Sequence, residues 1–335
     1  MINRVKTFSK FLLFFALGIF LLWLTTRSFG EKEIQELKLL IKNANVQVVV
    51  ISTSILLFSH YIRALRWKMM IQPLGCNPSS SNVFFSVLAG YFFNLLFPRL
   101  GEVMKCTFLS RYEKVPVDKL IGTMVAERLV DMICLIMVIL ATILTQIDRV
   151  GNYANELANL LRAKLNMTPL SWGLTISFLL IVIIFAVRLF KVSKNHPKLF
   201  KLKELIKGMI EGLTTIRKVR HFKLYIFYTG AIWICYLASI RIGFYGMEEL
   251  QIMGWVPSLS ILTFGSFAMI ATQGGIGAYQ LAVQKTLVLY GINEVTGLAF
   301  GWLLWLVQTV MLFIVGPASV LLLFIFNKKS NKIET

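Results

Sequence analysis

The chain has 335 residues, of which 57% are hydrophobic and 15% are charged, and its formal net charge is +19. With a mean hydropathy of +0.72, this composition excludes an ordinary soluble globular protein and is typical of a polytopic helical membrane protein. The lysines and arginines fall in short loops between apolar segments, as the positive-inside rule describes, so we expect no nucleic-acid partner.

The cysteines are scattered and form no CxxC motif, and no histidine lies at metal-ligand spacing from any of them. We therefore expect free thiols without a structural disulfide, and neither a metal site nor a cofactor. The four residues are Cys76, Cys106, Cys134 and Cys235.

The N-terminal part predicts a first transmembrane helix over about 8–26, which runs outward from a basic N-terminus. Residues 31–45 are amphipathic and are expected to lie on the outer membrane surface. This arrangement places the N-terminus in the cytoplasm.

A second helix over about 46–62 returns inward and ends in the sequence RALRWK. Arg63 and Arg66 mark this end as cytoplasmic, and Trp67 is expected at the level of the lipid headgroups. Two interpretations of the arginines stay open, because they are either headgroup contacts or topology signals.

The next apolar run, 83–97, is about 15 residues long and stops at Pro98, which is too short to cross a ~30 Å hydrocarbon core. A re-entrant hairpin over 83–111 that opens to the cytoplasm is therefore predicted. Arg99 is expected to point its planar fork at a carboxylate or phosphate, although an ordinary loop charge is the alternative. Gly101 is expected to ease the turn. We expect Arg99, Gly101 and Glu102 to bind the substrate and Asn94 to be a headgroup contact, with Pro98 breaking the helix before them.

A long helix over about 119–146 carries Glu127, Arg128 and Asp131. At 1.5 Å per residue, Glu127 and Asp131 lie roughly 12 Å and 18 Å from its start, near the middle of the membrane. The three charged residues are expected to pair with one another or with Arg99 and Glu102 of the first hairpin. Ionisable groups at this depth usually mark a substrate or ion path, and the alternative is a purely structural ion cluster.

The middle of the chain predicts an outer loop and a returning helix over 170–190. The most basic stretch, 191–223, follows with apolar residues at helical spacing. We expect it to lie on the anionic inner leaflet, and a solvated connector is the alternative.

The last third repeats the earlier order, with a helix over 224–246, a second interrupted segment over 258–290 that opens outward, and a final helix over 297–326. Glycines relax the backbone before a helix that begins near Ala278, whose amides would suit an anion. Close helix packing is the alternative. The residues of this motif are Gly274, Gly275, Gly277 and Gln280.

The halves 46–146 and 224–326 therefore predict an inverted repeat, joined by the linker 191–223, within a single transmembrane domain over 1–335. The fold class is an all-α polytopic membrane protein with about six transmembrane helices, two re-entrant helical hairpins and both termini in the cytoplasm. Paired interrupted segments point to a transport site between the halves.

The motifs N-x-x-x-P-R-x-G-E-x-x-K, E-R-x-x-D and G-G-I-G begin at Asn94, Glu127 and Gly274. Together they resemble the lysylphosphatidylglycerol synthase transmembrane-region, or UPF0104, family over about 10–325. The resemblance implies a flippase-like protein of the cell inner membrane, similar to the flippase half of multiple peptide resistance factors. Its substrate would be an anionic or aminoacylated phospholipid or a polyprenyl-linked intermediate. We expect no enzyme activity and no soluble catalytic domain.

Two other functions stay open. A membrane glycosyltransferase that uses a polyprenyl phosphate would need external carboxylates, for which the early candidates are Glu31, Glu33 and Glu36. An accessory scaffold would leave the buried charges unused. The sequence also leaves open a homo-oligomer.

Overall fold

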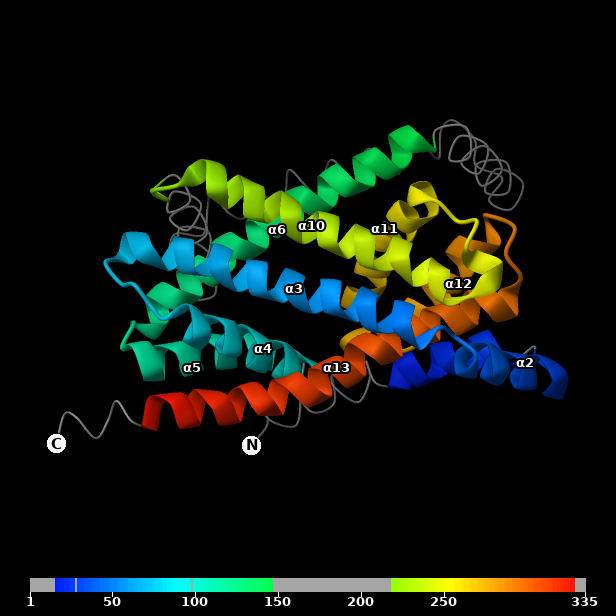
Figure 1. Ribbon diagram of the computed structural model, residues 1–335, viewed down its shortest axis with the longest axis horizontal. Helices are drawn as coiled ribbons and strands as arrows, with labels where there is room; N and C mark the ends of the chain where they lie inside the picture. The colour runs from blue at the N-terminus through cyan, green and yellow to red at the C-terminus, as the bar shows by residue number, and fades with distance from the viewer. Residues whose placement is uncertain (1–15, 28, 98, 147–217, 329–335) are drawn as a thin grey trace, which may run out of the picture.

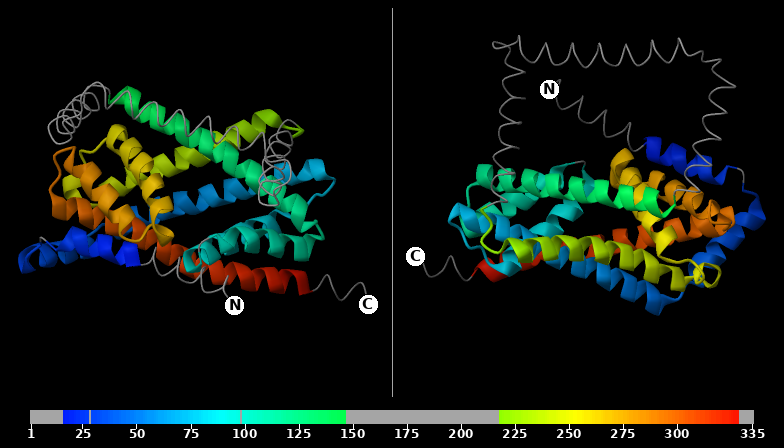
Figure 2. Two further views of the ribbon diagram at one scale, coloured as in Figure 1. Left: turned by 180° about the vertical axis from the view of Figure 1, so that it is seen from behind. Right: turned by 90° about the horizontal axis from the view of Figure 1, so that it is seen from above.

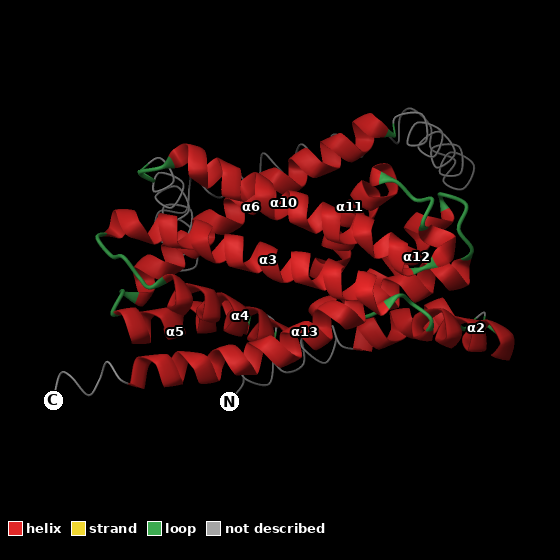
Figure 3. Cartoon of the chain, in the orientation of Figure 1, coloured by secondary structure: helices red, strands yellow, loops and turns green. Residues whose placement is uncertain are grey.

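The computed structural model describes residues 16–27, 29–97, 99–146 and 218–328, and within these ranges the chain is helical without strands (Figure 3). Four helices are long and apolar enough to cross a membrane, Val46–Leu74, Val117–Thr145, Phe222–Gly246 and Glu294–Lys328. They confirm the predicted all-helical membrane class. The predicted helix over 170–190 and most of the basic segment 191–223 lie outside the described residues. The first predicted helix is described over Ala16–Thr26.

The long helices begin and end close to the predicted positions, with one exception. They are α3 (Val46–Ile71), α6 (Val117–Thr145), α10 (Phe222–Gly243) and α13 (Glu294–Lys328). The exception is α3, which continues through RALRWK instead of ending near residue 62. Its start is fixed by Asn45, whose side chain accepts hydrogen bonds from two backbone amides of the first turn. A separate helix, α2 (Glu31–Lys42), precedes it.

The first interrupted segment forms a hairpin of α4 (Ser80–Leu96) and α5 (Leu100–Glu113). Phe97 is extended at φ −139° and ψ 132°, as expected for a residue before proline. Arg99 takes the left-handed conformation at the turn, with φ 64°. Gly101 therefore does not ease the turn as predicted. Its role is close packing, because a Cβ there would overlap the carbonyl of Gly90.

The second interrupted segment contains α11 (Trp255–Ala271), the 3₁₀ turn η4 (Gln273–Gly275) and α12 (Ala278–Val288). Its three glycines have left-handed φ angles of 60° at Gly274 and 75° at Gly275 and Gly277, a conformation that glycine adopts without strain. The predicted relaxation of the backbone before Ala278 is confirmed.

The two hairpins lie at opposite ends of the long helices (Figures 1 and 2). Their tips approach each other, where α4 contacts η4. There the Trp305 indole donates to the Gly274 carbonyl at 2.7 Å. Each half thus has the order long helix, hairpin, long helix, as the predicted repeat requires. The orientation of the halves in a bilayer and the re-entrance of the hairpins stay predictions.

At the base of the first hairpin, α13 is joined to α4 by a pair of side-chain amides. Asn82 Nδ2 lies 3.0 Å from Asn327 Oδ1, and Asn327 Nδ2 lies 2.9 Å from Asn82 Oδ1. Asn82 also donates to Glu113 Oε1 at 2.7 Å. We call this the first end contact.

At the base of the second hairpin, the residue after α6 makes an equivalent connection. Gln146 Nε2 donates to Ser260 Oγ at 2.7 Å, and Tyr290 donates to Gln146 Oε1. We call this the second end contact. In both end contacts, the end of the last long helix of one half is hydrogen-bonded to the hairpin of the other half.

Because Gly90 and Gly101 are in close contact, we predict that any side chain at position 101 lowers the stability of the protein. Gly101→Ala places a methyl group against the Gly90 carbonyl and the Asn94 side chain, so we expect a loss of about 1–3 kcal/mol of stability. The thermal midpoint of the detergent-purified protein measures this loss.

The matched control is Gly122→Ala on α6, where a Cβ would meet no atom within 4 Å. This control should melt at or above the parent temperature, because alanine favours helix. Equal melting of Gly101→Ala and the parent would contradict the close packing of α4 on α5.

Candidate functional site

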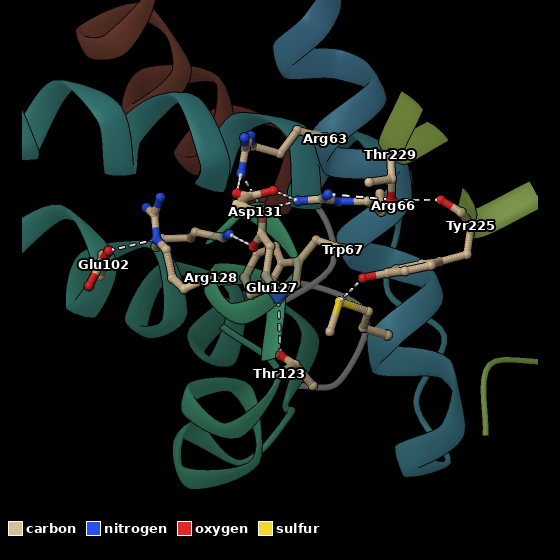
Figure 4. A network of polar contacts seen from close by, with 12 residues as sticks. Arg63, Arg66, Trp67, Glu102, Thr123, Glu127, Arg128, Asp131, Tyr225 and Thr229 are labelled. Carbon is tan, nitrogen blue, oxygen red and sulfur yellow. Dashed lines mark hydrogen bonds and ion pairs between the residues drawn. The ribbon is translucent and has the colours of Figure 1, made fainter. Parts of the chain in front are cut away.

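Five charged side chains from three helices meet inside the molecule, and we call them the ion cluster. They are Arg63 and Arg66 of α3, Lys105 of α5, and Glu127 and Asp131 of α6. The arginines are three residues apart and the carboxylates four, so each pair lies on one helix face. Figure 4 shows both arginines directed toward Asp131.

Glu127 contacts all three cations and is only 2% exposed. Its Oε1 lies 2.9 Å from Arg63 Nη1 and 3.4 Å from Arg66 Nη2. Its Oε2 lies 2.7 Å from Lys105 Nζ. Both carboxylate oxygens are therefore occupied, as a buried charge requires.

Asp131 completes the cluster by contacting both arginines. Its Oδ2 lies 2.6 Å from Arg63 Nη1, and its Oδ1 lies 2.8 Å from Arg66 Nη2. Neutral groups of α10 cover the far side, where Arg63 donates to Tyr236 OH at 3.0 Å and Arg66 donates to Thr229 Oγ1 at 3.5 Å. Tyr236 and Thr229 are neutral, so they cover this side of the ion cluster without adding a charge to it.

The ion cluster holds three cations and two carboxylates, which leaves an excess of one positive charge. The neighbouring ion pair does not change this balance, because Arg128 Nε and Glu102 Oε1 neutralise each other at 2.9 Å. A buried charge excess is unfavourable unless an anion approaches it. The arrangement therefore favours binding of an anionic group.

A cavity of about 290 Å³ lies between the long helices, and we call it the central cavity. Apolar side chains such as Leu56, Ile261 and Leu303 form much of its wall. Tyr236 lines the central cavity and accepts from Arg63, so it joins the cavity to the ion cluster. Tyr91 lines both this cavity and a polar pocket of about 20 Å³ beside Lys105.

The structure corrects the prediction for the end of the second helix. Arg63 and Arg66 are buried in the ion cluster, with 5% and 0% of their surfaces exposed. Trp67, expected among the headgroups, is fully buried and donates to Thr123 Oγ1 at 3.0 Å. The predicted helix end at residue 62 is wrong because these polar groups find partners inside the protein. Contact of the arginines with a lipid headgroup stays a prediction.

The first hairpin contributes to the site partly as predicted. Glu102 pairs with Arg128, which is one of the predicted pairings between the long helix and the charges of the first hairpin. Arg99 is exposed at the tip of the hairpin and is not part of the ion cluster. Asn94 Oδ1 accepts from the Gly101 amide at 2.9 Å, so this side chain fastens the hairpin as well as lining the small pocket.

The glycine motif of the second hairpin is closely packed. A Cβ on Gly275 would overlap Met269, and one on Gly277 would overlap the carbonyl of Gly18. These contacts support the packing alternative for the motif. Gln280 is fully buried, and its amide atoms have no hydrogen-bond partner in the described ranges.

Sequence reasoning missed Lys105, His60, Tyr91 and Tyr236 as site residues. Lys105 closes the N-x-x-x-P-R-x-G-E-x-x-K motif, and a lysine in an apolar helix could have drawn attention to it. His60 lies one turn before Arg63 in an apolar stretch. The tyrosines carry no comparable pattern, because only the packing of α4 and α10 brings them to the cavity.

The family model described as the lysylphosphatidylglycerol synthase TM region matches residues 11–316. A UPF0104 membrane protein of Methanocaldococcus jannaschii is 32% identical over 92 residues, which make up 27% of this chain and 27% of that protein. No solved structure matches the chain.

The geometry of Glu127 predicts that its charge holds the ion cluster together. Glu127→Gln leaves three buried cations with one carboxylate, so we expect a loss of about 3–5 kcal/mol of stability. Adding Lys105→Met should restore part of this loss, because it removes the cation that depends on Glu127. Thermal unfolding of the purified variants measures both effects.

The matched control is Arg128→Gln, since Arg128 and Glu102 form a pair whose side chains are 48% and 28% exposed. Its cost should stay within about 1 kcal/mol. If Glu127→Gln proves no more costly than this control, the ion cluster does not stabilise the fold.

Proposed function

The chain belongs to the lysylphosphatidylglycerol synthase transmembrane-region family, and from this premise we propose that it binds an anionic lipid and moves it between membrane leaflets. The substrate class is an anionic or aminoacylated phospholipid or a polyprenyl-linked lipid intermediate. In this proposal the protein is a transporter of the cell inner membrane and not an enzyme.

The positive excess of the ion cluster is the observation that carries this proposal. Two arginines and a lysine, each at most 8% exposed, face only two carboxylates. Structural ion pairs alone would be most stable with balanced charges, since every unpaired buried charge is costly. A phosphate group supplies the missing negative charge and accepts the charge-assisted hydrogen bonds that guanidinium and ammonium groups donate.

The position of the central cavity supports a lipid over a free anion. Its mostly apolar wall suits hydrocarbon or the apolar part of a headgroup, and Tyr236 connects it to Arg63. A lipid can place its phosphate near the ion cluster while its chains extend toward apolar surroundings. Arg99, exposed at the tip of the first hairpin, is placed in this proposal as an early contact for the anion.

The glycosyltransferase alternative has no comparable support. Of its candidate carboxylates, Glu33 accepts a hydrogen bond from the Gly30 amide at 2.9 Å and caps α2. This contact gives Glu33 a structural role. We therefore favour lipid movement over a reaction at these residues.

Lys105→Met tests the proposal by removing the charge excess while Glu127 keeps both arginines as partners. We expect movement of phosphatidylglycerol to slow by about tenfold or more, because one charge-assisted contact is lost. Fluorescent phosphatidylglycerol in proteoliposomes, with dithionite quenching of the outer leaflet, measures the rate.

Lys285→Met makes the same charge change at an exposed ion pair with Glu294 and should move the lipid at the parent rate. Equal rates for Lys105→Met and the parent would refute the assigned role of the ion cluster, provided that both variants reconstitute to the same level.

A further inference from the structure

His60 is a buried polar side chain that the ion cluster does not use. It lines the central cavity and is only 3% exposed. Its ring lies 4.4 Å from the Tyr91 ring, measured between centroids. Neither ring nitrogen has a hydrogen-bond partner in the part of the chain that the structure describes.

An unpartnered imidazole inside a membrane protein needs a ligand or water, because buried polar groups are almost always hydrogen-bonded. A neutral imidazole offers one donor and one acceptor. Two hydroxyl groups of a polyol match this pair, since one can accept from the ring N–H and the other can donate to the unprotonated nitrogen. A second anionic group would satisfy only the donor.

The serine and threonine hydroxyls of this wall donate their hydrogen atoms within the protein. Ser52 and Ser239 bond to each other's carbonyl oxygens at 2.8 Å and 3.0 Å. Thr53 donates to the Val49 carbonyl at 2.7 Å. They can accept hydrogen bonds from a ligand, whereas His60 has both a donor and an acceptor available to one.

His60 is also close to the proposed anion site. It lies three residues before Arg63 on α3, a spacing that puts their Cβ atoms about 5–6 Å apart. One short headgroup can therefore place a phosphate near Arg63 and a hydroxyl near His60. Tyr236 lines the same cavity and accepts from Arg63, which makes the two positions continuous.

We propose that the central cavity binds the hydroxyl-bearing end of an anionic lipid headgroup and that His60 determines the preference for that hydroxyl. The inference rests on the proposed function and narrows its substrate class. A phosphodiester with a polyol substituent fits both positions, whereas a phosphodiester with an alkyl substituent fits only the anion site.

Two lipids with identical acyl chains test this preference. Phosphatidylglycerol carries headgroup hydroxyls, and phosphatidylpropanol has the same charge without them. Native mass spectrometry of the full chain with each lipid gives the affinities. We expect the parent to bind phosphatidylglycerol about 3- to 10-fold more tightly, the range that one hydrogen bond supplies.

His60→Phe keeps a ring against Tyr91 and removes both nitrogens. We expect this variant to lose the preference, so that it binds phosphatidylglycerol only as tightly as phosphatidylpropanol. Its affinity for phosphatidylpropanol should equal that of the parent. His60→Gln keeps a donor and an acceptor and should retain part of the preference. His221→Phe, the same change at an exposed position, is the matched control and should retain all of it.

The outcomes separate this inference from the proposed function. If the parent binds both anionic lipids equally, or if His60→Phe keeps the preference, water alone satisfies His60 and the inference is overturned. If neither lipid binds more tightly than phosphatidylcholine with the same chains, the proposed function fails and the inference fails with it. The comparison of the two lipids on the parent protein decides the matter even if His60→Phe does not fold.

Discussion

The burial of the Glu127 carboxylate is the constraint on which the rest of the site depends. A charge that is 2% exposed is stable only when cations surround it on several sides. Three helices satisfy this requirement, because α3 supplies two arginines, α5 supplies a lysine and α6 supplies the carboxylate itself. The relative positions of these helices are therefore fixed by electrostatics as well as by apolar packing.

The close approach of α4 and α5 in the first hairpin helps to bring Lys105 to Glu127. Gly90 and Gly101 let α4 and α5 approach so closely that no side chain fits between them. The Asn94 carboxamide fastens the same contact through the Gly101 amide. The first hairpin thus places a cation inside the protein. The Lys105 ammonium also lies 3.9 Å from the centroid of the Trp67 ring, and this cation–π contact stabilises it further.

The long helices and the two interrupted segments could be predicted from sequence because hydropathy, segment length and the positions of Pro98 and Gly274 are local properties. The site could be predicted only in part. Glu127 and Asp131 stand out as charges within an apolar helix. Their partner Arg63 lies 64 residues from Glu127, and no local pattern links the two. Arginines at the end of an apolar helix usually lie at the membrane surface, so the predicted helix ended before Arg63. The burial of Arg63 was therefore not predicted.

The two end contacts differ in kind from the ion cluster, and this difference bears on how the protein deforms. Every ion pair of the cluster lies within the first-half helices α3 to α6. The end contacts connect one half to the other through amides and hydroxyls. A neutral hydrogen bond that is exchanged for water costs a net ~1 kcal/mol, whereas breaking a buried ion pair costs several. The first half should therefore be stiff around the ion cluster, whereas the end contacts should open more readily, and added salt should affect them little because the hydrogen bonds that join the halves there link neutral groups.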